Sequence, residues 1–209
     1  MSQDSCKSQN GTVLPQFRSK ALIAVGANMP SVEGDARETV IWAIREFANN
    51  GWVIRSVSHL FETPCFPPGA GPDYINAAFV LDTELSAPEV LAQLHAVEAA
   101  AGRERLQRWG QRSLDLDLIA LGDQVLPDAQ TVSDWMALPL DQQVRRTPDE
   151  LLLPHPRLQD RAFVLGPLVE VAPDWVHPLT GKTVREMFDM LPQAERDAVK
   201  RLVYPVDWT

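Results

Sequence analysis

The stretch RWGQRSLDLDLIAL, residues 108–121, sets the expectation for the fold. Leucines stand at the alternate positions 114, 116 and 118, which is the period-two pattern of a strand with one buried face. Successive side chains of a strand point to opposite faces, so Asp115 and Asp117 share the face opposite the leucines. The pattern therefore predicts a strand over Leu114–Leu121 that carries two neighbouring carboxylates.

The residues before this strand predict the order β-α-β-β-α-β. Apolar residues at helical spacing predict one helix after Ser31, its expected N-cap, and a second over Ala87–Ala101. Alternating and continuous apolar runs predict three further strands, at Lys20–Val25, Trp52–Phe61 and Tyr74–Thr83. This order is typical of an α+β ferredoxin-like sandwich, in which two helices back an antiparallel sheet.

The remaining segments add to that plan. Weak periodicity and three prolines predict a long surface loop over Gly122–Glu150, with an insertion at about 127–150. We expect a helix over about Pro156–Leu168, a short helix after Thr183, and an extra C-terminal hairpin. The polar residues 1–19 predict a disordered N-terminal extension, so that one domain would span residues 20–209.

The composition limits the class of protein. The chain has 209 residues, 45% of them hydrophobic, and a formal net charge of −9. An acidic balance argues against general binding to nucleic acid or to anionic membranes. No apolar run approaches the length of a membrane span, and the N-terminus lacks the apolar region of a signal peptide. With only Cys6 and Cys65, we expect a cytoplasmic protein without a disulfide framework.

The acid pair and the residues before it suggest chemistry on phosphates. Paired carboxylates are oxygen ligands suited to Mg²⁺, although alternating Asp is also ordinary on a solvated sheet face. Four arginines precede the pair in this otherwise acidic chain: Arg103, Arg105, Arg108 and Arg112. Guanidinium groups bind phosphates bidentately, although a solvated basic loop would have the same composition. The combination favours phosphoryl transfer from a nucleotide.

Several motifs together resemble one family. They are LIAVGAN (22–28), FETP (61–64), PDYINAA (72–78), EAAAGRER (98–105), RWGQRSLDLDLIALGDQVL (108–126) and LPHPRLQDRAFVLGPLVEVAP (153–173). In this order, from about residue 20 to 190, they resemble the 6-hydroxymethyl-7,8-dihydropterin pyrophosphokinases of folate biosynthesis. The resemblance implies transfer of the β,γ-diphosphate of ATP to the hydroxymethyl group of the dihydropterin, with release of AMP.

The resemblance also implies roles for individual residues. ATP would be the co-substrate, and Asp115 and Asp117 would hold two Mg²⁺ ions. The residues implied in catalysis are Arg103, Arg112, Asp115 and Asp117. Those implied in ATP binding are Glu98, Arg105, Arg108, Arg112, His155 and Arg161.

A second set of residues would bind the pterin. The resemblance implies Thr63, Pro64, Phe66, Tyr74, Asn76, Trp109 and Phe163. Tyr74 and Phe163 would stack on the two faces of the ring, and Asn76 would bind its amide-like edge, with Gly26 and Asn28 beside the pocket. By composition alone, the two aromatic residues are as well explained by core packing.

The chain departs from the family pattern in two places. The loop between Gly102 and Trp109 is slightly shorter, which leaves the register of Arg105 open, and the segment 127–150 replaces a short hairpin. Glu150 stands where the family has an arginine that contacts ATP. Arg145 or Arg146 would supply that contact in its place, or the contact would be absent. Apolar residues of the insertion could cover the site or bind a partner. The apolar residues are Trp135, Met136 and Leu138.

Two other classes of function stay open. A nucleotidyltransferase also uses a hydrophobic-flanked Asp-x-Asp, but it needs Gly-Ser at a helix start shortly before the acids, and here Gly110 precedes Gln111. A non-catalytic ferredoxin-like binding module would be expected to have lost the acids or the stacking residues, and this chain has both. The expected partners are ATP and the pterin, without nucleic acid or membrane, and the chain would be a monomer or a homodimer.

Overall fold

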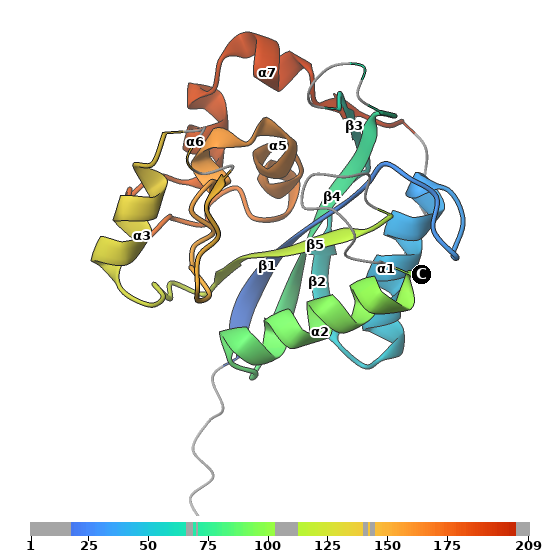
Figure 1. The fold of residues 1–209 in the computed structure, drawn as a ribbon, viewed down its shortest axis with the longest axis horizontal. Coiled ribbons are helices and arrows are strands. Elements are labelled where there is room, and N and C mark those ends of the chain that lie inside the picture. The colour runs from blue at the N-terminus through green and yellow to red at the C-terminus, as the bar shows by residue number, and fades with distance from the viewer. Residues whose placement is uncertain are drawn as a thin grey trace, which may run out of the picture.

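The structure is a computed structural model that describes residues 18–65, 69, 71–102, 113–139, 142 and 145–203. Among these residues, six antiparallel strands form one sheet in the order β5-β1-β4-β3-β6, with β2 also paired to β4 (Figure 1). The strands are β1 (Ser19–Ala27), β2 (Val53–Val57), β3 (Phe61–Thr63), β4 (Tyr74–Thr83), β5 (Asp115–Leu121) and β6 (Lys200–Arg201). The arrangement confirms the expected ferredoxin-like α+β sheet.

Helices cover both faces of the sheet, which makes three layers (Figure 1). On one face lie α1 (Ala36–Asn49) and α2 (Ala87–Ala100), and on the other α5 (Ala162–Val171) and α6 (Val184–Met190). Shorter elements are α3 (Ala129–Met136), the 3-10 helix η1 (Leu158–Asp160) and α7 (Gln193–Asp197). No helix of the described ranges has both the length and the apolar character needed to cross a membrane.

The alternation of β1 explains why the sheet is buried on both sides. Ala21, Ile23 and Val25 join the core under α1 and α2, whereas Leu22 and Ala24 join the core under α5 and α6. All five side chains are at most 9% exposed. A polar side chain on the α5 face of this sheet therefore stands out as a candidate for function.

Two expectations for the N-terminal part are corrected. Strand β1 begins at Ser19, inside the expected extension, and residues 1–17 lie outside the described residues. The cap of α1 is Asp35 and not Ser31. Asp35 accepts the backbone N–H of Glu38 over 2.8 Å, and Glu38 accepts the N–H of Asp35 over 2.9 Å, a reciprocal capping box. The backbone of Ser31 instead closes a small turn with Gly34.

The strand predicted over Trp52–Phe61 is divided. Strand β2 ends at Val57, and β3 begins only at Phe61. The hydroxyl of Ser58 accepts the backbone N–H of Ala78 over 2.9 Å, and so takes the place of a carbonyl in the ladder. A side-chain acceptor thus interrupts a segment whose residue types favour a strand.

The predicted loop over Gly122–Glu150 contains helix α3. Asp128 caps this helix by accepting the N–H of Thr131 over 2.9 Å, and Val132 is buried. Eight residues are too few to give a visible helical period, which is why the sequence pattern did not reveal the helix.

The helix predicted over Pro156–Leu168 starts and ends later. Arg161 is extended, with φ −118° and ψ 98°, so α5 begins at Ala162 and the residues before it form only η1. The short helix expected after Thr183 is confirmed as α6. In place of a regular C-terminal hairpin, an isolated bridge joins Val176 to Thr183.

Candidate active site

The register of the sheet brings the predicted site residues onto one face. Gly26 of β1 pairs with Asp115 of β5 on one side and with Asn76 of β4 on the other. Thr63 of β3 pairs with Tyr74, which lies two residues before Asn76 in β4. Directly paired residues lie on the same face, which here is the face covered by α5. Adjacent strands are about 4.8 Å apart, so the backbones of Asp115 and Asn76 are separated by roughly 10 Å.

Asn76 is fixed in its orientation by two neighbours. Its Nδ2 donates a hydrogen bond to Thr63 Oγ1 over 2.6 Å, and both side chains are 6% exposed. A Cβ at Gly26 would lie only 2.6 Å from Asn76 Oδ1, so this position of β1 accommodates glycine alone without movement. Beside this pair, Asn28 Nδ2 donates to the carbonyl of Pro72 over 3.2 Å and anchors the chain that enters β4.

Aromatic surface borders this polar pair. Tyr74 is half-buried and shares a face with Asn76, two residues along β4. Phe163, in the first turn of α5, is 41% exposed, and the Arg161 guanidinium lies 5.6 Å from the centre of its ring. Pro64 is exposed at the end of β3. An exposed aromatic ring at the start of a well-packed helix is suited to contact a planar ligand.

The two acids lie on the same face, both half-buried. Asp117 Oδ2 is 3.9 Å from Arg161 Nη1, and this ion pair joins β5 to the start of α5. Within the described ranges, no group of three or more His, Cys, Asp and Glu side chains is placed to hold a metal. Two carboxylates fit Mg²⁺, whose other ligands are commonly water and phosphate oxygens, better than a closed transition-metal site.

Glu98 supports the strand that carries the acids. It is 3% exposed at the end of α2, and its Oε1 accepts the backbone N–H of Leu116 over 2.8 Å. Leu116 lies between Asp115 and Asp117 on the outer edge of β5. The carboxylate therefore binds an edge amide that would otherwise need another acceptor. Its implied contact with ATP stays a prediction.

His155 is held as a neutral ring near the acids. Its backbone N–H donates to the carbonyl of Ile119 over 2.8 Å, which ties it to β5. Its Nδ1 accepts the backbone N–H of Arg157 over 3.1 Å, so the ring proton resides on Nε2. Burial, together with the charges of Arg161 and Arg157, lowers the pKa of His155 to about 3, against the opposing effects of a backbone hydrogen bond and then of Asp115.

Six predicted residues lie outside the described residues: Phe66, Arg103, Arg105, Arg108, Trp109 and Arg112. Their roles stay sequence-based predictions. One residue that our sequence interpretation assigned no role is Arg157, although it stands in the quoted PHPR motif. The structure places Arg157 on the same turn as His155, and this proximity makes it a candidate residue of the site.

The insertion joins β5 at the end away from Asp115. Helix α3 follows the C-terminal end of β5, whereas Asp115 is the first residue of that strand. Arg146, one of the two expected substitutes for the family arginine, lies with its guanidinium 5.6 Å from the centre of the Trp135 ring of α3. Trp135, Met136 and Leu138 are half-buried.

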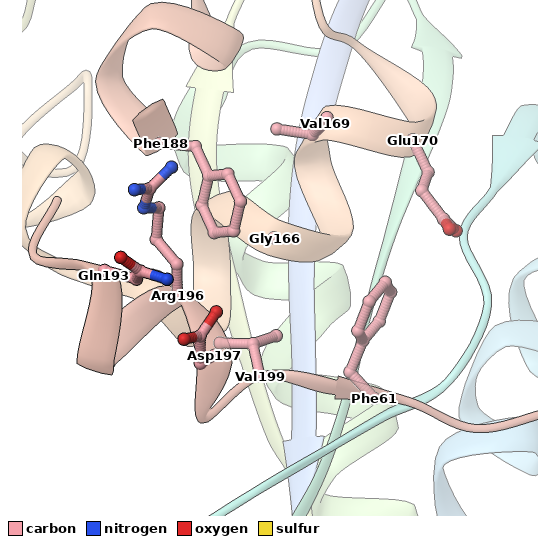
Figure 2. Close-up of a pocket in the computed structure, with 9 residues that line it drawn as sticks. All are labelled: Phe61, Gly166, Val169, Glu170, Phe188, Gln193, Arg196, Asp197 and Val199. Atoms are coloured by element: carbon pink, nitrogen blue, oxygen red, sulfur yellow. The ribbon is translucent and has the colours of Figure 1, made fainter. Parts of the chain in front are cut away.

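A cavity of about 450 Å³ lies beside the site, between α5, α6, α7 and β3 (Figure 2). Phe61, Val169 and Phe188 give it apolar walls, and Arg196 and Asp197 add charged groups. None of the predicted site residues lines it. The cavity is therefore not lined by the acids or by the Asn76 side chain.

Two carboxylates that can hold metal ions, with an arginine beside them, are suited to an enzyme that transfers phosphoryl groups. A family model gives this class a name. The model of 7,8-dihydro-6-hydroxymethylpterin-pyrophosphokinase (HPPK) matches residues 22–173, and the chain belongs to this family of enzymes.

Relatives agree with this assignment. A Synechocystis protein is 37% identical over 181 residues, which cover 86% of this chain and 80% of that protein. A Haemophilus influenzae protein is 31% identical over 158 residues, which cover 76% of this chain and 84% of that protein. Both are named 2-amino-4-hydroxy-6-hydroxymethyldihydropteridine pyrophosphokinase.

Solved structures support the fold. The crystal structure of wild-type Plasmodium falciparum HPPK-DHPS superposes with a TM-score of 0.55 at 13% identity. The match covers 83% of this chain and 44% of that one, so this chain spans less than half of the solved protein. At this identity the likeness concerns the fold alone.

Proposed function

We propose that this chain transfers the diphosphate of ATP to the hydroxymethyl group of 6-hydroxymethyl-7,8-dihydropterin, with AMP as the other product. The names of the relatives support the substrate and the reaction. The observation that carries the proposal for this chain is the row Asp115–Gly26–Asn76 across the sheet. It sets a carboxylate and a fixed amide roughly 10 Å apart on one face.

The Asn76 end of the row would bind the pterin. A pterin presents a carbonyl, a ring N–H and an amino group along one edge, and a carboxamide can pair with such an edge. The hydrogen bond to Thr63 and the close approach of Gly26 keep the Asn76 amide in one orientation, so little entropy is lost when the ring binds. Tyr74 and Phe163 would stack on the ring faces.

The Asp115 end of the row would bind the triphosphate. Asp115 and Asp117 would hold two Mg²⁺ ions, which would supply positive charge to offset that of the phosphates. Arg161, already beside Asp117, can turn its donors to a phosphate oxygen. His155 offers its Nε2–H as a neutral donor at physiological pH, because its pKa lies far below that range.

The transfer itself would be a displacement at phosphorus. The hydroxymethyl oxygen forms a bond to the β-phosphorus, the bond from that phosphorus to the oxygen bridging it to the α-phosphate breaks, and AMP leaves. The hydroxyl proton passes to solvent. The role of this chain is to position the two substrates in line and to hold opposite charge around the phosphates, which supplies most of the acceleration in such reactions.

Product analysis tests the proposal. The purified chain, ATP, Mg²⁺ and the hydroxymethyl pterin should give AMP, and omission of the pterin or of Mg²⁺ should abolish AMP formation. Formation of ADP in place of AMP, or AMP formation that does not need the pterin, would contradict the proposal. Stoichiometric pterin binding without turnover would instead indicate the binding-module alternative.

A further inference from the structure

We propose that Arg157 is an additional phosphate-binding residue of this site and contacts the triphosphate of ATP; the proposal rests on the function proposed above. Arg157 precedes η1 and lies on the turn that carries His155. Its backbone N–H donates to His155 Nδ1 over 3.1 Å, and this bond places the ring proton of His155 on Nε2. The question is what the side chain does.

The Arg157 guanidinium is an unusual cation. Its Nε is buried and has no hydrogen-bond partner among the described residues. Burial lowers the pKa of Arg157, the nearby charge of Arg161 lowers it further, and Asp160 acts in the opposite direction. Among the described residues, no hydrogen bond joins Asp160 to the Nε of Arg157, and Asp160 Oδ2 accepts from Gln159 Nε2 over 3.0 Å. A partly desolvated cation of this kind is unfavourable until an anion pairs with it.

The neighbours of Arg157 indicate which anion would bind. Arg161 is paired with Asp117, and His155 is neutral, so Arg157 supplies positive charge on this turn that no described carboxylate contacts. The same turn is tied to β5 by the bond from His155 to the carbonyl of Ile119. A phosphate held near Asp115 and Asp117 would therefore lie within the reach of a long arginine side chain. A guanidinium matches phosphate oxygens in geometry and charge.

A purely structural role makes a different prediction. If Arg157 only stabilised the turn, its removal would lower the melting temperature and weaken both substrates together. If the Arg157 guanidinium is paired with an anion only when a ligand binds, its removal from the free protein eliminates an unfavourable buried charge. The stability of the free protein should then stay equal or rise. Only ligands with phosphates should then lose affinity.

The test compares Arg157→Met with Arg185→Met, which removes the same charge from an exposed position of α6. Binding of α,β-methylene-ATP and of inorganic tripolyphosphate, each with Mg²⁺, is measured by calorimetry. We expect Arg157→Met to weaken both about 10- to 100-fold. The pterin dissociation constant should stay in the wild-type range, the melting temperature should stay equal or rise, and Arg157→Lys should restore part of the affinity. Arg185→Met should bind all ligands normally.

Other outcomes overturn the proposal. One is that Arg157→Met binds tripolyphosphate with unchanged affinity, whether or not it binds α,β-methylene-ATP more weakly. The other is that Arg157→Met loses stability and pterin affinity together. The AMP assay on the wild-type chain separates the two proposals. Wild-type turnover with normal phosphate binding by Arg157→Met refutes only the role of Arg157. Phosphate binding that depends on Arg157 in a chain without turnover refutes only the reaction.

Discussion

Replacing Gly26 with alanine should disable the pterin end of the site. The new Cβ would lie 2.6 Å from Asn76 Oδ1, well inside contact distance, so the Asn76 side chain has to rotate. Rotation breaks its 2.6 Å bond to Thr63 Oγ1 in a place where both side chains are 6% exposed. Leaving such buried groups unpaired costs about 1–3 kcal/mol, and we expect the free energy of unfolding to fall by that amount.

Urea unfolding and pterin fluorescence titration measure the two expected effects. A matched control is Gly71→Ala, because a Cβ there would meet Asn28 Nδ2 at an ordinary 3.7 Å. We expect Gly26→Ala to weaken pterin binding at least about 10-fold, which is the effect of losing one well-placed hydrogen-bonding group. Gly71→Ala should leave stability and affinity close to those of the wild type.

A double variant tests whether the clash is the cause. In an Asn76→Ala background the obstructing oxygen is gone, so adding Gly26→Ala should cost little further stability. If Gly26→Ala is equally destabilising in both backgrounds, or if the single variant keeps normal stability and pterin affinity, the argument from close approach is wrong.

Three further predictions follow from the same geometry. Burial lowers the pKa of His155 to about 3, so above pH 5 this ring takes up a proton only on unfolding, and burial also lowers the pKa of His177. The stability that the neutral His155 ring contributes should be nearly constant above pH 7 and should fall as the pH drops through 6.5, with a slope that approaches about 1.4 kcal/mol per pH unit near pH 5, and His177 should act in the same direction; flat urea-unfolding energies over this range would contradict this. Glu98→Ala should lower the unfolding free energy by about 1–3 kcal/mol by leaving the Leu116 amide without its acceptor, and Glu98→Gln should cost less; equal losses would refute the hydrogen-bond account. Asp117→Ala should reduce kcat by roughly 1000-fold or more at unchanged melting temperature, and near-normal turnover would exclude Asp117 as a metal ligand.

The alternation in LDLDL was enough to predict which face of β5 carries the acids. Its leucines at 114, 116 and 118 belong to the core under α1 and α2, as the period of two requires. The positions of β4 and α2 were also predictable, because their apolar patterns are long and end at clear turn residues. In these segments, local preference and tertiary packing favour the same structure.

The rest of the site depends on pairing between distant strands. Nothing local to Gly26 indicates that its neighbour across the sheet is Asn76, and nothing in PHPR indicates which nitrogen of His155 bears the proton. The break after Val57 likewise depends on Ser58 meeting Ala78 from another strand. Long-range register decides such contacts, and a single sequence does not encode register in any short window.

Labelled ATP tests the central claim most directly, because it identifies the bond that breaks. The chain, Mg²⁺ and the hydroxymethyl pterin are incubated with ATP labelled at either the α- or the γ-phosphate, and the products are separated. The account predicts that the γ-label moves to the pterin, as a diphosphate ester, while the α-label stays in AMP. An α-label on the pterin with release of pyrophosphate, or a γ-label on the pterin with ADP as the other product, would contradict it.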